Sequence, residues 1–498
     1  MKNSKVLKNI VVGFGGQFLI MVLGFVIPRV MITSYGSDTN GLVSTISQIF
    51  TYAALLEAGI GQAARNALFK PIAENDRDGV CYIASIAKNY YRRITLYYGI
   101  VVLLLCFVSP LIIKTSLNYW TVFWMVFFEG MSGVVSFYFI STTTTILNAD
   151  GRGYITNGVN VINKIVSYFV KICMAVMGAN IVILQFSYFL ITVCKTFFYQ
   201  SYFRKNYKWV SFHSAPKTEK LKDRNAYIVS ELAWTIFSST DMIVLSTFLS
   251  TQASSVYGVY NMIFSSISML LNAVYSSINY LLGQTYHRNI KEYTHLHDMF
   301  NSVFFGTMTS LMCVAYVLCL PFIRLYTSGV TDVDYINGTL PLLFCLVQII
   351  SWSRYVSGNL TAVAGYAKYT GIVSAIEAGL NITLSVILVN KLGIVGVLLA
   401  TVLALPLKVV VCTYLSEAKI LRRSPWKSIR IMAANFVLFS ATVAITNRLN
   451  VAITNYVDFI LYGILITGIC VTIGIAVNYL ANPDMLNIVK MALKRRKA

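Results

Sequence analysis

Charged residues are scarce in this sequence, and acids are the scarcer kind. Only 12% of its 498 residues are charged, about half of the roughly 25% that is usual in a soluble globular protein. This composition excludes an ordinary water-soluble domain, because most of the chain must lie against lipid or inside a protein embedded in lipid. The 40 Lys and Arg against 19 Asp and Glu give a net charge of +21. Since the bases gather in short loops between apolar stretches, they indicate membrane orientation rather than nucleic-acid binding.

Metal-binding and redox motifs are also missing. The four histidines lie in or beside basic loops, and most of the nine cysteines lie singly within apolar stretches. No CxxC and no Cys/His metal spacing occurs. We therefore expect no metal site and no cofactor, and we interpret the cysteines as small apolar packing residues.

Long apolar stretches are abundant, and each is long enough to cross a bilayer, which takes about 20 residues. The first one follows Lys2, Lys5 and Lys8 and is too long for the core of a signal peptide, so we expect it to be retained. We predict an all-α integral membrane protein with about 14 transmembrane helices. The expected spans are 10–34, 41–68, 94–113, 119–147, 154–178, 180–203, 226–249, 255–283, 298–323, 338–363, 367–390, 393–415, 429–448 and 457–480.

The basic residues of the loops predict the orientation of the chain. Even-numbered connections hold the dense basic runs at 88–93, 204–208, 217–224 and 419–430, whereas odd-numbered connections hold little beyond single bases such as Lys114. Loops rich in Lys and Arg stay on the cytoplasmic side. We therefore expect a multi-pass protein of the cytoplasmic membrane, with both termini in the cytoplasm and only short loops outside.

The two halves of the chain look related. Three glycine-centred matches have nearly equal offsets, which is the signature of an internal repeat. We expect an N-lobe at 1–210 with spans one to six, a C-lobe at 211–418 with spans seven to twelve, and a region 419–498 with two added spans and a basic tail. The matching pairs are Gly41 and Gly258 (217 apart), Gly153 and Gly365 (212 apart), and Gly178 and Gly393 (215 apart).

Several spans carry a charged residue in the membrane, most of them near mid-depth. Such a charge costs at least ~2.5–3.5 kcal/mol on insertion scales, so it is by default a functional hypothesis. Lys164 and Lys171 are seven residues apart and share one polar helix face. The candidate bases are Arg29, Lys164, Lys171 and Arg354, and the candidate acids are Glu57, Asp241 and Glu377.

The charges of the first half do not balance. Arg29, Lys164, Lys171 and Lys195 stand against only Glu57 and Glu129. Pairing within this half is therefore incomplete, and an anionic ligand would supply the missing charge. Phosphate is a natural partner of Lys and Arg. The alternative is that these charges pair inside the helix bundle and only fix its packing.

Several short blocks of the sequence resemble one family of membrane proteins. They lie at 35–42, 57–63, 68–76, 148–154, 239–241, 381–384 and 392–401, and the block 57–63 reads EAGIGQA. These blocks resemble bacterial Wzx-type flippases of polysaccharide repeat units, which belong to the multidrug/oligosaccharidyl-lipid/polysaccharide (MOP) exporter superfamily. The resemblance covers nearly the whole chain, and it marks Arg29, Glu57 and Asp241 as family-like charged positions.

The resemblance implies two six-helix lobes around a central cavity and a transport function rather than an enzymatic one. Alternating access would move an undecaprenyl-pyrophosphate-linked oligosaccharide from the inner to the outer leaflet for surface polysaccharide assembly. The four candidate bases would bind the substrate, and the three candidate acids would bind H⁺ or Na⁺ for coupling. Membrane lipids and the polysaccharide polymerase machinery are further expected partners.

Two other functions remain open. A multidrug cation antiporter of the same superfamily usually has twelve spans and an acidic cavity, so the two added spans and the basic first half argue against it. A membrane polysaccharide polymerase or ligase generally carries large outside loops, and here the outside loops are short. An accessory membrane subunit would leave the charges inside the spans unexplained.

Overall fold

The computed structural model is mainly helical over the residues that it describes, which are 2–54, 61, 64–65, 67–69, 71–72, 74–212, 240–448 and 453–486. Within these residues no strand is present, so the predicted all-α fold class is confirmed. Ten helices of the described part are long and apolar enough to cross a membrane. This count does not confirm fourteen spans, and most of the expected span 226–249 lies outside the described residues.

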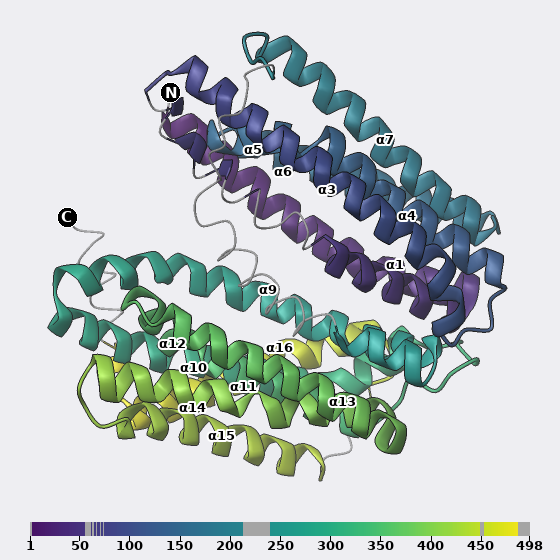
Figure 1. Cartoon of the computed structure of the whole chain (residues 1–498). Coiled ribbons are helices and arrows are strands. Elements are labelled where there is room, and N and C mark those ends of the chain that lie inside the picture. Colours follow the sequence, from purple (N-terminus) through teal and green to yellow (C-terminus); the bar gives the residue numbers. More distant parts are fainter. Residues whose placement is uncertain are drawn as a thin grey trace. The chain divides into compact units, whose positions relative to one another are not determined.

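The chain divides into two compact units, Met1–Val256 and Tyr257–Ala498, which we call unit 1 and unit 2. Within unit 1, α1 packs against α6, α3 against α4, and α4 against α7 (Figure 1). The helices of unit 1 are α1 (Lys2–Ala53), α3 (Arg77–Ile112), α4 (Tyr119–Phe139), α5 (Ser141–Ala149), α6 (Gly153–Val176) and α7 (Ile181–Asn206).

Unit 2 is built around α10, which packs against α11, α15 and α16. The last two helices of the chain therefore belong to this unit. The boundary between the units falls inside α9 (Thr251–Arg288). The remaining elements are α10 (Ile290–Tyr326), α11 (Thr339–Ser353), α12 (Tyr355–Val363), α13 (Ala367–Ala404), α14 (Pro406–Tyr414), the π-helix η1 (Leu415–Ile420), α15 (Trp426–Thr446), α16 (Tyr456–Ala481) and the 3₁₀-helix η2 (Pro483–Leu486).

Two of the long helices are each a pair of helices that meet at a glycine. Gly36 in α1 has φ 82°, and Gly393 in α13 has φ 60°. These left-handed backbone conformations are open to glycine at little cost, because glycine has no Cβ. The expected end of span one, at residue 34, and the expected start of span two, at residue 41, lie on either side of Gly36. Span twelve was expected to begin at Gly393, three residues after the expected end of span eleven. Each merged helix thus contains one predicted span and the beginning of the next.

Short polar side chains set the starts of the helices. Asp76 accepts a hydrogen bond from the Gly79 amide at the start of α3, and Asn118 and Asn180 do the same for α4 and α7. Asn289 accepts from two amides at the start of α10. These N-caps satisfy backbone donors that the helix itself leaves unpaired.

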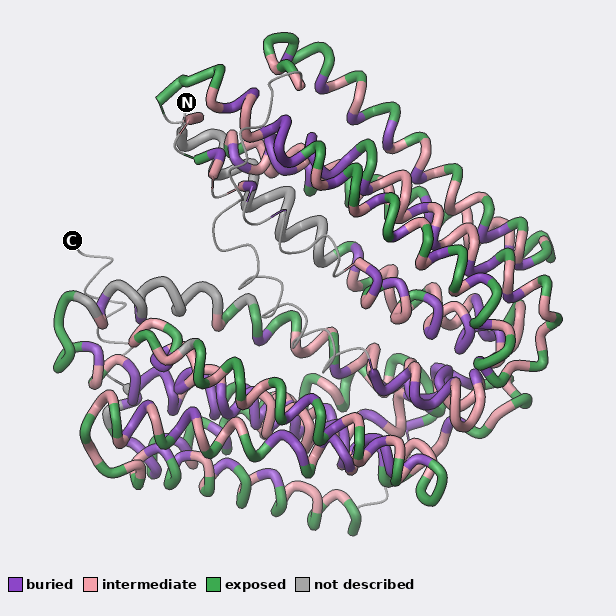
Figure 2. Tube along the Cα trace, in the orientation of Figure 1, coloured by how far each residue is buried: buried purple, intermediate pink, exposed green. Residues whose placement is uncertain are grey.

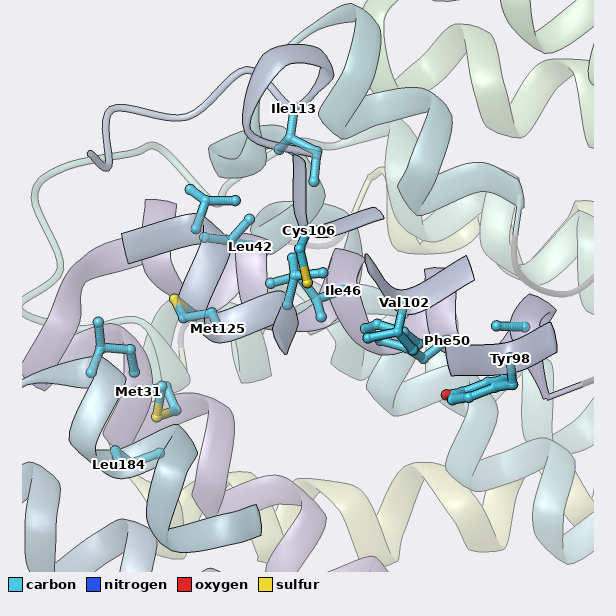
Figure 3. Close-up of a cluster of buried hydrophobic side chains, with 14 of the residues drawn as sticks. Met31, Leu42, Ile46, Phe50, Tyr98, Val102, Cys106, Ile113, Met125 and Leu184 are labelled. Atoms are coloured by element: carbon cyan, nitrogen blue, oxygen red, sulfur yellow. The ribbon is translucent and has the colours of Figure 1, made fainter. Parts of the chain in front are cut away.

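Apolar side chains lie both inside and outside each unit. In unit 1, Figure 3 shows Leu42 and Ile46 of α1 close to Cys106 of α3 and Met125 of α4, all in one buried cluster. Figure 2 shows that exposed positions run along the helices of both units. Many large apolar side chains are among the exposed residues, as with Leu480, which is 79% exposed. Apolar residues on the outside are favourable only against lipid, which fits a multi-pass membrane protein.

Structural landmarks of unit 1 recur at nearly equal spacing in unit 2. The landmarks are helix caps, helix-internal prolines, helix breaks and glycines with positive φ. Their common offset indicates that both units are built on the same chain plan. The pairs are Asp76 and Asn289 (213 apart), Pro110 and Pro321 (211 apart), Ile140 and Arg354 (214 apart), Gly151 and Gly365 (214 apart), and Gly178 and Gly393 (215 apart).

Candidate functional site

Helix α6 carries two lysines within a membrane-spanning segment. Lys164 is exposed, and Lys171, about two turns further along, is half-buried. The Lys171 ammonium lies 5.1 Å from the centroid of the Tyr188 ring on α7, which is within the range of a cation–π contact. The Lys171 side chain therefore points towards α7 and not away from the helix bundle.

A third lysine extends this positive group. Lys195 of α7 is half-buried, and it and Lys164 repel each other electrostatically. Glu129 of α4 is attracted to Lys171 and accepts a 2.5 Å hydrogen bond from Gln185 Nε2 of α7. We call Lys164, Lys171, Lys195 and Glu129 the lysine cluster. It holds three positive charges and one negative charge on α4, α6 and α7.

Unit 2 contains a second charged group, at the break between α11 and α12. Arg354 ends α11, and its Nη1 donates to both carboxylate oxygens of Glu377, at 2.6 and 2.8 Å. Both side chains are more than nine-tenths buried. Lys408 of α14 is half-buried, attracted to Glu377 and repelled by Arg354. We call Arg354, Glu377 and Lys408 the arginine cluster, and it also has one more positive than negative charge.

Two other predicted site residues of unit 1, Arg29 and Asp241, are not part of either cluster as defined above. Arg29 is half-buried on α1, directly after Pro28. Asp241 is 8% exposed, next to Thr240, whose hydroxyl is 2.5 Å from the Tyr52 hydroxyl of α1. Glu57 lies outside the described residues. Lys164 and Lys171 were predicted as one pair on a single helix face, whereas Arg354 and Glu377 were predicted in separate roles and the fold brings these two into direct contact.

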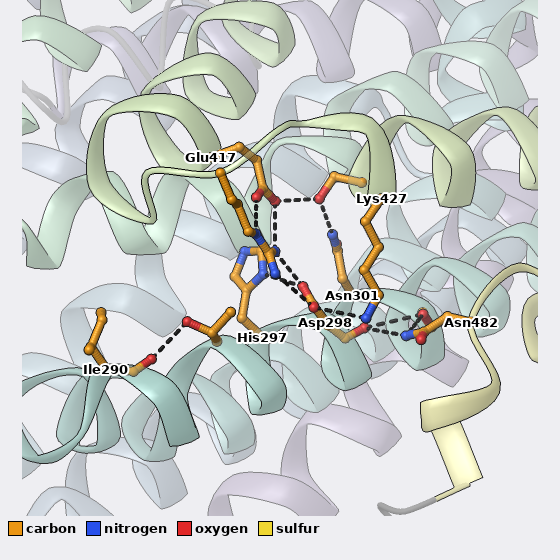
Figure 4. A network of polar contacts seen from close by, with 11 residues as sticks. Ile290, His297, Asp298, Asn301, Glu417, Lys427 and Asn482 are labelled. Carbon is orange, nitrogen blue, oxygen red and sulfur yellow. Dashed lines mark hydrogen bonds and ion pairs between the residues drawn. The ribbon is translucent and has the colours of Figure 1, made fainter.

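A further ionic network joins the start of α10 to the segment between η1 and α15. Arg423 donates to both carboxylate oxygens of Asp298 at 2.5 and 2.8 Å, and its Nε donates to Glu417 at 2.6 Å. Lys427 reaches Asp298 at 3.0 Å, as Figure 4 shows. Burial by itself lowers the pKa of Arg423, but the hydrogen bonds and charges of Asp298 and Glu417 raise it above its usual value. Two bases and two acids balance here, so we interpret this network as structural.

Sequence reasoning missed the partners of these charges. Glu129 and Gln185 are 56 residues apart, and Asp298 and Arg423 are 125 apart. A search for charges within apolar spans finds Glu129 but overlooks Gln185, because an amide is uncharged. Arg423 lies in a basic loop, where a base carries no signal of its own. Within the described residues, no group of three or more His, Cys, Asp or Glu could hold a metal ion.

Comparison by sequence finds no relative: no model of a protein family matches this chain, and no curated protein matches it. Solved structures do match its fold. An inward-facing multidrug resistance MATE family transporter of the MOP superfamily has a TM-score of 0.68 at 15% identity, over 81% of this chain and 95% of that one. The lipid II flippase MurJ, in an inward closed conformation, has a TM-score of 0.66 at 15% identity, over 95% of this chain and 99% of that one.

A MOP superfamily transporter from Pyrococcus furiosus, described as having a binding pocket of reverse polarity, matches with a TM-score of 0.53 at 14% identity, over 84% of this chain and 96% of that one. At such low identity the likeness concerns the fold alone. The fold is that of MOP-superfamily transporters, and the neighbours are transporters and flippases rather than enzymes.

Proposed function

We propose that this protein is a flippase that carries a polyprenyl-pyrophosphate-linked oligosaccharide from the inner to the outer leaflet of the cytoplasmic membrane by alternating access. The observation that supports this proposal is the positive excess of both charge clusters within the spanning helices. The lysine cluster has three bases to one acid, and the arginine cluster has two bases to one acid. An uncompensated base in lipid is costly, and an anionic cargo would supply the missing charge.

The bases take the role of anion binding in this proposal. Arg29, Lys164 and Lys171 in unit 1 and Arg354 in unit 2 attract the pyrophosphate and acidic sugars. Arg354 is held by Glu377 in the structure, so the cargo must compete with this carboxylate. Protonation of Glu377 would release the guanidinium, which makes Glu377 a coupling residue for H⁺. Asp241 and Glu57 are further candidates for binding H⁺ or Na⁺.

Charge reversal of the lysine cluster tests the proposal. Lys164→Glu and Lys171→Glu, singly and together, are expected to abolish surface polymer in cells that depend on this protein, because the cargo phosphate would then meet added negative charge. Surface polymer and the amount of protein in the membrane are both measured. Lys291→Glu, at an exposed position at the start of α10, serves as the control and is expected to leave polymer unchanged.

Normal polymer in the double variant, with normal protein levels, would remove the lysine cluster from cargo binding. Translocation of a fluorescent polyprenyl-pyrophosphate oligosaccharide in vesicles then distinguishes loss of transport from loss of assembly. In this assay the wild type is expected to move the lipid across the bilayer and the double variant is not.

A multidrug cation antiporter is the second candidate, favoured by the TM-score of 0.68 to a MATE family transporter. Organic cations would be repelled by the positive excess of both clusters, whereas an antiporter for cations needs acids to bind them. Export of a cationic dye from cells that express the protein separates the two. Dye export that survives Lys164→Glu and Lys171→Glu would favour the antiporter.

A further inference from the structure

Unit 1 contains a pocket that belongs to neither charge cluster. Its volume is about 420 Å³, within the usual range for small-ligand sites. Its lining comes from three places: the turn before α3, the junction of α5 and α6, and the segment that follows α7. In Figure 1, α3 begins and α7 ends at the same end of unit 1. This end carries basic loops, so we expect it to face the cytoplasm.

The first wall of the pocket is a tight turn that ends in a helix cap. Asn75 has φ 54°, a left-handed conformation that is uncommon outside glycine. The Asp76 amide donates to the Pro71 carbonyl at 2.9 Å, and the Asp76 carboxylate accepts from the Gly79 amide at 2.9 Å. A Cβ on Gly79 would lie 2.2 Å from Asp76 Oδ2, so a larger residue there would displace the capping carboxylate. The Asp76 carboxylate is thus engaged by the first turn of α3.

The second acid of the pocket is also engaged. Asp150 Oδ2 lies 2.8 Å from Arg152 Nε, and the Tyr207 hydroxyl donates to the same oxygen at 2.6 Å. Burial, and next the hydrogen bond to Asp150, raise the pKa of Tyr207, so this hydroxyl stays protonated and remains a donor. The negative charge of Asp150 is therefore compensated within the wall.

Arg77 is the pocket cation without a hydrogen bond or ion pair to the residues that the structure describes. Its guanidinium lies 5.5 Å from the Trp209 ring, and no hydrogen-bond acceptor for it is found among the residues that the structure describes. Contact with a ring holds the planar group in place while its N–H donors stay available. Arg152, 5.3 Å from the Tyr207 ring, gives Nε to Asp150 and Nη1 to Tyr202 at 3.4 Å. Its Nη2 points to no acceptor in the described chain.

We propose that this pocket binds a phosphate group, with Arg77 as its bidentate partner and Arg152 as a second donor. Guanidinium forks match phosphate oxygens in geometry as well as in charge. Three exposed bases lie at the end of α7 and just after it, beside the pocket lining: Arg204, Lys205 and Lys208. Their charge raises the local concentration of anions. The phosphate can come from an anionic phospholipid of the inner leaflet or from a soluble phosphorylated compound, since the recognised chemistry is the same.

The test uses the purified full-length protein and two probes. Inorganic pyrophosphate in detergent is the soluble probe, and phosphatidylglycerol in nanodiscs or mixed micelles is the lipid probe. Thermal unfolding and native mass spectrometry report binding. Arg77→Gln is expected to weaken binding by at least about tenfold. This factor corresponds to the loss of one charge-assisted hydrogen bond, which is the least that removing a bidentate partner can cost. Arg93→Gln, at an exposed position of α3 outside the pocket lining, is the matched control and should bind like the wild type.

The outcomes separate the two sources of phosphate. Arg77-dependent stabilisation by pyrophosphate assigns the pocket to a soluble ligand, and Arg77-dependent retention of phosphatidylglycerol alone assigns it to a lipid. Equal binding of both probes by the wild type and Arg77→Gln, or by neither, overturns the proposal. Arg77 makes no hydrogen bond to the described protein, so its removal should leave folding intact, and Arg77→Lys should retain part of the binding. The result is independent of the flippase assay.

Discussion

The Arg354–Glu377 pair shows how a single charge is tolerated within a spanning helix. Removing one partner of a buried ion pair leaves an uncompensated charge, whereas replacing both can be nearly neutral. Lys408 makes the pair asymmetric, because it is attracted to Glu377 and repelled by Arg354. The acid therefore compensates two bases, and each base alone is less important for stability than the acid.

This asymmetry predicts the stabilities of three variants. Glu377→Gln leaves two bases together and is expected to lower the free energy of unfolding by about 3–5 kcal/mol. Arg354→Gln is expected to cost less, because Lys408 remains to compensate Glu377. The double variant should be more stable than Glu377→Gln alone, since one of the two bases is gone. Denaturant or thermal unfolding of the purified proteins in detergent measures these differences, and equal losses in both single variants would contradict the role of Lys408.

At the scale of the elements, α1 and the start of α9 meet closely within unit 1. The Asp38 carboxylate accepts hydrogen bonds from the Thr115 hydroxyl, the Ser116 amide and hydroxyl, and the Thr251 hydroxyl. Two residues further on, Asn40 Nδ2 donates to the Ser255 hydroxyl at 2.8 Å. These contacts join three segments of unit 1 that are distant in sequence, and so they fix the first residues of α9 against α1.

Gly41 is the point of closest approach between these two helices. A Cβ there would lie 1.7 Å from the Thr251 carbonyl oxygen, which is backbone and cannot rotate away. Gly41→Ala is expected to push the helices apart and to lower the free energy of unfolding by roughly 1–3 kcal/mol. Gly24→Ala on the same helix has open space around it and is the control, expected to be neutral or to stabilise by about 0.5–1 kcal/mol. Thermal unfolding of both variants is the measurement, and equal effects would refute close packing at Gly41.

At the scale of the whole molecule, the distribution of loop bases predicts which ends of the helices face the cytoplasm. Thr331 and Ser424 lie in exposed loops between α10 and α11 and between η1 and α15. In a variant whose native cysteines are replaced, Thr331→Cys is expected to react in intact cells with a membrane-impermeant thiol reagent, whereas Ser424→Cys should react only after lysis. Labelling in the opposite pattern would reverse the orientation, and with it the proposed direction of transport.

The likeness to solved structures also belongs to this scale. A flippase and a multidrug transporter share the fold with this chain at equal identity, so the fold does not choose between an anionic lipid and an organic cation. The choice depends on the few charges inside the spans, among them Lys164, Lys171, Arg354 and Glu377.

The sequence alone determined the all-α membrane class, but not every helix break, because the breaks at Ile140 and Arg354 lie inside the expected spans 119–147 and 338–363. Hydropathy is a local property, and bilayer thickness fixes the length of a span, so apolar runs can be recognised without knowledge of their neighbours. Gly36 and Gly393 could be expected at or near span ends because a positive φ suits glycine. The excess of bases over acids within the spans of the first half can likewise be read from the sequence, because it requires only the residue types and the span positions.

Only the tertiary structure decided which charges meet. Glu377 holds Arg354 across 23 residues, Gln185 of α7 holds Glu129 of α4, and Arg77 comes to lie against Trp209. These contacts depend on how helices far apart in sequence pack and rotate against each other, and hydropathy carries no information about that. A charge in an apolar run therefore shows in the sequence that a partner is required, and packing of the helices selects the partner.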